Sequence, residues 1–279
     1  MSDAGQLHFG CKSDLLSCLE PLQPSIDSEP QVDAAVLDGA VIVSMLKSEN
    51  VKTFEEYVGS VFMPCIYSQM SKVHRLDVVW DCYQQASVKG LMRVKRGCAA
   101  RQQVHSSAPV PRNWQEFLRN DENKTALFCY LADQMCIKPI PNGKVLVSTC
   151  GEMVKSTQCS FDASNLQPCT HEEADTRMLL HAADIVRAGF DKVVVRTVYT
   201  DVVVLAIAFH DKIKCTELWI AFGTGRHFRH ISIHDLASAL GPQRSCGLPV
   251  FHSLSGCDTV SAFVGRGRKT CWDTWNKYS

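Results

Sequence analysis

The chain contains short apolar runs that stop at or just before an acidic residue. Residues 31–39 (QVDAAVLDG) and 75–81 (RLDVVWD) each have the pattern of a buried β-strand that ends in an aspartate. A third run, 191–198 (DKVVVRTV), leads through Tyr-Thr into another aspartate and a second apolar run. A carboxylate between buried segments is unfavourable unless something pairs with it. The pattern therefore predicts three acidic side chains at strand ends, Asp38, Asp81 and Asp201.

Segments with helical spacing separate these strands. The clearest helix is predicted over 171–190, where apolar residues share one face and Gly189 is placed to end it. Further helices are predicted over 51–70, 113–135, 234–241 and 248–256, and further strands over 144–150, 216–223 and 227–233, the last two as a hairpin. Strands that alternate with helices predict an α/β fold with a mostly parallel central sheet flanked by helices.

Composition divides the chain into a lead-in and one domain. Residues 1–31 mix Ser, Pro, Gln and Asp and are expected to be poorly ordered, whereas 32–279 have globular patterning. The 279 residues suffice for a large α/β core. The sequence stops in or soon after a predicted helix, so we expect a domain that is truncated at its C-terminus.

Charge and cysteine content set limits on partners and compartment. Basic and acidic residues number 29 each, so only local charge can indicate nucleic-acid binding. The 14 cysteines include no CxxC pair, which makes a zinc finger unlikely on spacing alone. The N-terminus lacks a signal-peptide pattern, and the longest apolar run, Val202–Phe209, is too short to span a bilayer. We therefore expect reduced cysteines and an intracellular protein, nuclear or cytoplasmic.

The acidic residues are expected to meet in one crevice. Carboxyl ends of parallel strands lie at one edge of a sheet, where ligands bind. Glu173 and Asp175 open the helix 171–190, and Asp258 follows a short helix, so these side chains could face the same edge. Each one alone could instead be a helix-terminus or turn residue. As a set, clustered carboxylates require a cation, and their oxygens suit Mg²⁺ or Mn²⁺.

Basic segments follow two of the acids. Residues 84–101 carry Lys89, Arg93, Lys95 and Arg96 without an acidic residue, and 265–269 read GRGRK. Backbone N–H groups of a Gly-x-Gly turn, with nearby Lys and Arg, can bind a phosphate. An ordinary turn with a solvated basic face is an equally good interpretation of the same residues.

The order of these motifs resembles the PIN-like nuclease superfamily in its flap-endonuclease (FEN/XPG-type) branch. The resemblance covers roughly 32–279 and is carried by VLDG, VVWD, HEEADTRM, TDVVVL and SGCDTVSAFVGRGRKTCW. More narrowly, EEADT and FHxLxGCD are similar to PIN-like proteins found in many copies in animal genomes. The resemblance implies a Rossmann-like PIN-like sheet and a helix-hairpin-helix-like segment within 256–279.

The resemblance also implies roles for individual residues. Two Mg²⁺ or Mn²⁺ ions would be held by Asp38, Asp81, Glu173, Asp175, Asp201 and Asp258. The scissile phosphate would be steadied by Lys89 and Arg96, and the nucleic-acid backbone would be contacted by Lys89, Arg93, Lys95, Arg96, Gly265, Gly267, Arg268 and Lys269.

One position departs from the family pattern. The family has an acid where this chain has Tyr199, and a phenol is a poor ligand for Mg²⁺ at neutral pH. The sequence thus leads to two hypotheses. The first is a metal-dependent nuclease that hydrolyses DNA or RNA, at flaps, ends or branched structures. The second is a catalytically impaired PIN-like module that binds nucleic acid or protein.

Overall fold

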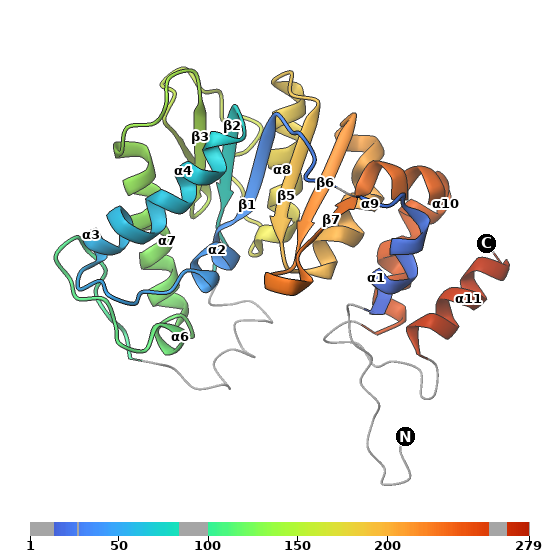
Figure 1. Cartoon of the computed structure of the whole chain (residues 1–279), viewed down its shortest axis with the longest axis horizontal. Helices are drawn as coiled ribbons and strands as arrows, with labels where there is room; N and C mark the ends of the chain where they lie inside the picture. The colour runs from blue at the N-terminus through green and yellow to red at the C-terminus, as the bar shows by residue number, and fades with distance from the viewer. Residues whose placement is uncertain (1–13, 27, 84–99, 257–266, 279) are drawn as a thin grey trace, which may run out of the picture. The chain divides into compact units, whose positions relative to one another are not determined.

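The structure, a computed structural model, describes residues 14–26, 28–83, 100–256 and 267–278. Within these residues, seven strands form a mostly parallel sheet flanked by helices, which confirms the α/β class (Figure 1). The chain divides into two compact units. One unit is 32–196, and the other combines 1–31 with 197–279. The expected domain 32–279 is therefore divided near Thr197.

The unit 32–196 is built on parallel strands. Its strand order is β4-β3-β2-β1-β5, and only the β3–β4 pair is antiparallel among the described pairings of this unit. In the register, Leu37 of β1 lies between Val78 of β2 and Arg196 of β5. The strand bounds are β1 Ala34–Asp38, β2 Arg75–Val79, β3 Val145–Cys150, β4 Met153–Ser156 and β5 Lys192–Thr197.

One face of this sheet packs on a large aromatic core. Leu37, Leu76 and Val78 point to the same side and join a cluster that includes Phe62 and Phe128. The helices that supply this cluster and its border are α2 Gly39–Met45, α3 Phe54–Tyr57, the π-helical turn Val58–Phe62, α4 Met63–Ser71, α6 Trp114–Phe117 and α7 Asp121–Ile137. The predicted helices over 51–70 and 113–135 are thus present, each in more than one segment.

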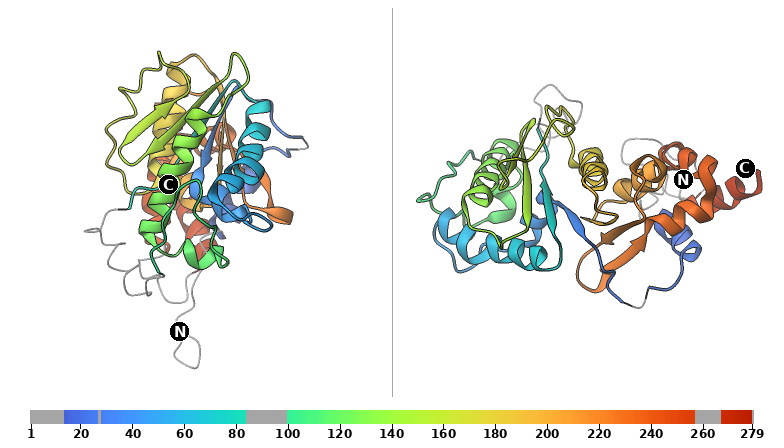
Figure 2. Two further views of the ribbon diagram at one scale, coloured as in Figure 1. Left: turned by 90° about the vertical axis from the view of Figure 1, so that its left-hand side faces the viewer. Right: turned by 90° about the horizontal axis from the view of Figure 1, so that it is seen from above.

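The other face of the same strands packs on α8 (Ala174–Arg187). Figure 2 shows the strands of this unit between α7 on one side and α8 on the other. Met178, Ala182 and Ile185 are fully buried, as the helical spacing predicts. Gly189 follows the helix with a positive φ of 93°, a conformation that suits glycine. Successive residues along a strand therefore pack alternately into the core on one face of the sheet and the core on the other.

The second unit combines a helical pair with a hairpin. Helix α9 packs along α10, and β6 pairs antiparallel with β7, which confirms the predicted hairpin. The two predicted helices over 234–256 are the halves of α10, separated by Gly241 with φ 74° and ψ 167°. The bounds in this unit are α9 Thr200–Ile213, β6 Glu217–Phe222, the 3-10 turn Gly225–His227, β7 Arg229–Ser232, α10 Ile233–Leu254 and α11 Arg268–Tyr278.

The lead-in is partly structured, contrary to the expectation for 1–31. Helix α1 (Asp14–Leu19) buries Leu15, Leu16 and Leu19 completely and packs on α11. The 3-10 turn Glu20–Leu22 follows it, and Gln23 accepts a hydrogen bond from the backbone of Ser232. A helix of six residues in a polar segment gives too short a pattern to detect, yet its three leucines are core residues.

A glycine at the end of β1 allows the chain to turn beside a tryptophan. A Cβ atom added to Gly39 would lie 2.3 Å from the ring of Trp80, closer than side chains pack. Trp80 is itself fixed, because its ring stacks on Phe128 at 4.6 Å and its Nε1 donates to Ser148. The ring cannot move aside easily, so residue 39 must lack a side chain.

We predict that Gly39→Ala lowers the free energy of unfolding by about 1–3 kcal/mol through overpacking against Trp80. Gly59→Ala is the matched control, since no atom lies within 4 Å of its added Cβ and the residue is helical. The control should gain about 0.5–1 kcal/mol. Urea unfolding of the three proteins measures both values, and equal effects would contradict the packing explanation.

Candidate acidic site at the strand ends

Asp38 is the last residue of β1 and the cap of the following helix. Its Oδ1 accepts a hydrogen bond of 3.0 Å from the backbone N–H of Val41 in α2. The side chain is buried, with only 1% of the residue exposed. The prediction that β1 ends at this aspartate is confirmed. The capping bond gives one carboxylate oxygen a partner, but it does not explain why the carboxyl group is buried so completely.

The electrostatics of Asp38 connect it to two other acids. The pKa of Asp38 is raised to about 8, mainly by burial; the charges of Asp81 and Asp175 contribute to the rise, and the backbone hydrogen bonds from Val41 and Ala40 oppose it. Carboxylates raise one another's pKa only when they are close. Three of the predicted acids, one at the end of β1, one just after β2 and one at the start of α8, therefore share one electrostatic environment.

Asp81 lies just beyond its strand rather than at the strand end. β2 stops at Val79, because the N–H of Trp80 donates to the side-chain hydroxyl of Thr149 at 2.8 Å instead of continuing the ladder. This corrects the prediction that the strand reaches Asp81. The side chain of Asp81 accepts hydrogen bonds from Tyr83 Oη at 3.0 Å and from the N–H of Ala174 at 2.9 Å.

The second of these bonds makes Asp81 the acceptor at the start of α8. Glu173 occupies the N-cap position of α8 without a side-chain capping bond, and Asp175 lies in the first turn, so both open this helix as predicted. The carboxylate of Asp81 takes the role that a capping side chain usually has. A second link supports the same junction, since Cys82 N–H donates to Glu172 O at 2.7 Å.

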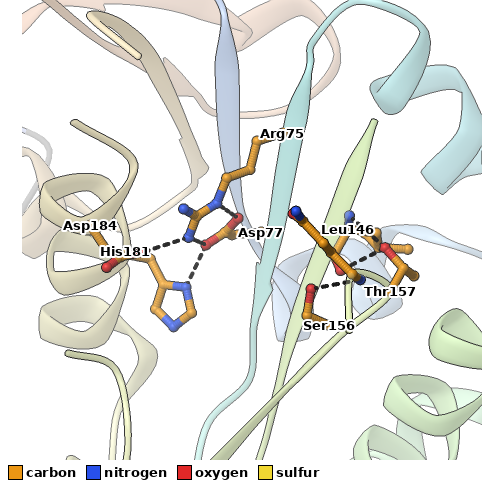
Figure 3. Close-up of polar contacts among 8 residues, drawn as sticks. Arg75, Asp77, Leu146, Ser156, Thr157, His181 and Asp184 are labelled. Carbon is orange, nitrogen blue, oxygen red and sulfur yellow. Dashed lines mark hydrogen bonds and ion pairs between the residues drawn. The ribbon is translucent and has the colours of Figure 1, made fainter. Parts of the chain in front are cut away.

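Helix α8 is fixed to the sheet by buried charges (Figure 3). Arg75 on β2 donates to both carboxylate oxygens of Asp77 at 2.8 Å, and its Nη2 also donates to Asp184 on α8 at 2.8 Å. His181 on α8 contacts Asp77 Oδ2 through Nδ1 at 2.7 Å. All four side chains are buried. The network thus determines where the helix that carries Asp175 can lie.

The network consists of charged side chains that are paired inside the core. Burial alone would raise the pKa of Asp77, but hydrogen bonds from His181 and Arg75 outweigh it and lower the pKa. Removing one partner from a buried ion pair typically costs about 3–5 kcal/mol. The network was not predicted from the sequence. Its signal was present as charged residues inside an apolar strand, RLD, and as His181 and Asp184 one helical turn apart.

Figure 3 also shows a link across the antiparallel edge of the same sheet. Thr157 follows β4, and its hydroxyl accepts from the N–H of Leu146 at 3.1 Å, while its own N–H donates to Leu146 O at 3.0 Å. The edge strand β4 is thereby held beside β3 to its last residue.

Asp201 lies on a helix in the second unit. The prediction placed it at the end of a strand, but β5 ends at Thr197 and α9 begins at Thr200, so Asp201 belongs to the first helical turn. Its Oδ1 accepts a hydrogen bond of 2.6 Å from His252 Nε2 on α10. The run Val202–Phe209 forms a helix that is buried on most sides, which explains its continuous apolar pattern.

Arg268 completes a chain of contacts to Asp201. Its Nη1 lies 3.0 Å from His252 Nδ1, and its Nη2 contacts the carbonyl oxygen of Gly256. A guanidinium only donates, so Nδ1 accepts and Nε2 carries the proton given to Asp201. Arg268, predicted to contact nucleic acid, is 2% exposed, whereas its neighbours Gly267 and Lys269 are exposed.

Tyr199 occupies the N-cap position of α9. Its side chain makes no capping hydrogen bond, although the N-terminus of a helix presents several N–H groups without helical partners. The phenol is about half exposed. An aspartate at this position would be both an acid and a good cap. The tyrosine therefore leaves the start of α9 without a side-chain cap.

Several predicted site residues lie outside the described residues. These are Lys89, Arg93, Lys95, Arg96, Asp258 and Gly265. Within the described part of the chain, no group of three or more His, Cys, Asp or Glu side chains is spaced to hold a metal ion. Asp38, Asp81 and Asp175 influence one another electrostatically, but they are not spaced as the ligands of one metal ion.

Comparisons with known proteins do not indicate a function, so the functional interpretation rests on the residues described above. Neither a protein-family model nor a curated protein matches the chain. Among the described helices, none is long and apolar enough to cross a membrane.

The raised pKa of Asp38 predicts a pH-dependent stability. Between about pH 4 and pH 8 the unfolded state has an ionised aspartate while the folded state keeps its proton, so the folded state binds more protons. Stability should therefore fall as pH rises through this window, by about 3–5 kcal/mol in the absence of divalent cations. Asp38→Asn keeps the cap on α2 and should remove this decline.

Urea unfolding in EDTA at several pH values compares the wild-type chain with Asp38→Asn. Asp162→Asn is the control, because Asp162 is exposed and far less sensitive to desolvation. Parallel pH profiles for the wild-type and Asp38→Asn proteins would show that Asp38 has an ordinary pKa.

We predict that Tyr199→Asp stabilises the chain by about 1 kcal/mol, because an aspartate at the N-cap accepts from the first N–H groups of α9. Tyr199→Ala is the control, since it removes the phenol and supplies no acceptor. Thermal unfolding measures both variants. If the two shift the unfolding midpoint alike, capping is not the cause.

Proposed function

We propose that this chain is a metal-dependent phosphodiesterase of PIN-like type that acts on DNA or RNA. One observation supports this proposal above the others. A buried strand-end carboxyl, Asp38, has its pKa raised to about 8 by burial, with Asp81 and Asp175 contributing. Acids gathered at the carboxyl ends of parallel strands, at the start of a helix, are the arrangement that a hard cation would neutralise.

The donor chemistry of these residues fits Mg²⁺ or Mn²⁺. All three side chains offer carboxylate oxygens, which both ions prefer. Asp81 keeps acceptor capacity, because each of its oxygens takes one described hydrogen bond and a carboxylate oxygen has two lone pairs. Glu173 and Asp175 stand at the N-terminus of α8, where the N–H of Ala174 donates to Asp81.

Each residue of the proposed site would have a distinct role. Asp38 releases its proton on cation binding, because a ligand must be deprotonated to coordinate. Asp81, held by Ala174 and Tyr83, positions the ligand set relative to α8. When bound, such ions lower the pKa of water and stabilise charge on the phosphate. Lys89 and Arg96 would steady that phosphate, as the resemblance implies.

A second candidate function is a PIN-like module that binds nucleic acid without cleaving it. Two observations favour it. Tyr199 replaces an expected acid. Asp201 is also already paired with His252 and, through it, with Arg268.

The deciding experiment combines calorimetry with a cleavage assay. Mn²⁺ is titrated into the chain near pH 7 in two buffers of different ionisation enthalpy. The wild-type chain should bind Mn²⁺ and release up to one proton, because Asp38 is mainly protonated at that pH. Asp38→Asn and Asp81→Asn should bind at least tenfold more weakly, and Asp38→Asn should release no proton. Asp162→Asn should behave as the wild type.

Cleavage is then measured on labelled flap, single-stranded and hairpin substrates with Mg²⁺ or Mn²⁺. The double variant Asp38→Asn/Asp81→Asn should lose activity by a factor of at least 100 while Asp162→Asn retains it. Equal cleavage by the wild-type chain and the double variant would overturn the proposal. Nucleic-acid binding without Mn²⁺ binding or cleavage would favour the second candidate.

A further inference from the structure

Two cysteines outside the acidic site face each other across a helix and a strand. Cys129 lies on α7 and Cys150 is the last residue of β3. Their sulfur atoms are 2.9 Å apart and share a hydrogen bond. A disulfide bond has a sulfur–sulfur distance of about 2.05 Å, so closing one requires an approach of roughly 1 Å.

The pair is held in place by regular structure on both sides. Phe128, the neighbour of Cys129, stacks on Trp80 at 4.6 Å, and Leu131 on the same helix is fully buried. Cys150 pairs with Met153 in the β3–β4 ladder. Both elements are therefore fixed in register, and the closeness of the thiols does not depend on a loop conformation.

Both sulfurs remain within reach of a small oxidant. Cys129 and Cys150 are each partly exposed, in contrast to Cys169 and Cys215, which are buried. The side chain of Cys136 lies two turns further along α7. Lys155 and Asp133 form an ion pair beside the thiols. The partly exposed thiols therefore lie next to charged groups, and the described residues contain no metal site.

The pKa of Cys129 bears on which of the two thiols reacts first. Burial raises the pKa of Cys129 to about 12, and the hydrogen bond and charge of Cys150 contribute to that rise. Cys129 therefore stays protonated at neutral pH. Since a thiolate is the reactive form, the raised pKa makes Cys129 poorly suited to react first, and the variants below test which thiol does so.

We propose that Cys129 and Cys150 are a redox pair that a peroxide converts to a reversible intrachain disulfide. The thiolate of Cys150 attacks one oxygen of hydrogen peroxide, the O–O bond breaks, and a sulfenic acid and hydroxide form. The sulfur of Cys129 then attacks the sulfur of the sulfenic acid, and hydroxide leaves as water with the proton of Cys129. Overall, two thiols and one peroxide give a disulfide and two waters.

The location gives the bond a structural consequence that does not depend on the proposed function. Cys150 is followed by the turn whose Gly151 and Glu152 carbonyl groups accept from Arg177 of α8. Cys129 is preceded by Phe128, which packs on the tryptophan next to Asp81. The disulfide would therefore join two segments that each support a part of the acidic cluster.

The test uses the full chain, reduced and then exposed to hydrogen peroxide. Free thiols are alkylated, and the protein is digested with trypsin without reduction. Mass spectrometry should find the peptide 125–144 linked to the peptide 145–155, and dithiothreitol should separate them. The peptide 125–144 carries both Cys129 and Cys136, so variants must assign the bond.

Cys136→Ser should keep the link, and Cys129→Ser and Cys150→Ser should lose it. A dimedone adduct on Cys150 should accumulate in Cys129→Ser, which shows the sulfenic acid even where no disulfide can form. Circular dichroism confirms that each variant is folded. The proposal is overturned if the link persists in Cys129→Ser, or if exposed Cys159 is oxidised while Cys129 and Cys150 remain alkylatable.

Discussion

The buried charges of Arg75, Asp77 and Asp184 are the interaction on which the site-bearing unit depends. Arg75 and Asp77 lie on the face of β2 that meets α8, and Asp184 is supplied by α8 itself. Each charge is removed from water, so each is tolerable only while the others are in place. A purely apolar interface would tolerate a small slide of the helix. Hydrogen bonds at 2.8 Å do not, so they fix both the position and the rotation of α8.

This fixed helix start explains why three acids can be held together. β1 and β2 are adjacent and parallel, so Asp38 and the segment after β2 reach the same edge of the sheet. The start of α8 reaches that edge because the charge network determines where the helix begins. Gly39 and Trp80 also help to position the end of β1. Because Gly39 has no side chain, the chain can turn directly against the fixed ring of Trp80. The acids are thus positioned by the core and not by each other.

Local patterns predicted much of this and failed for identifiable reasons. The strand ending at Asp38 and the helix opened by Glu173 and Asp175 were predictable, because alternation and helical spacing are local signals. Asp201 was misplaced because the strand predicted over 191–198 was expected to end at this aspartate, whereas β5 ends at Thr197 and α9 has already begun at Thr200. The partnership of Asp77 with His181 was not predictable, because more than 100 residues separate them. No local pattern reports such a contact.

The double use of Asp81 has a consequence for how ligands and helix stability are linked. The same carboxylate that is proposed to coordinate a cation also serves as the acceptor for the first N–H of α8. A capping bond contributes about 0.5–2 kcal/mol. A ligand that turns this carboxylate away must overcome that amount, and the first turn of the helix frays in return. Amide hydrogen exchange at Ala174 would then report on whether a ligand occupies the acidic site, because fraying of the helix terminus is linked to ligand binding.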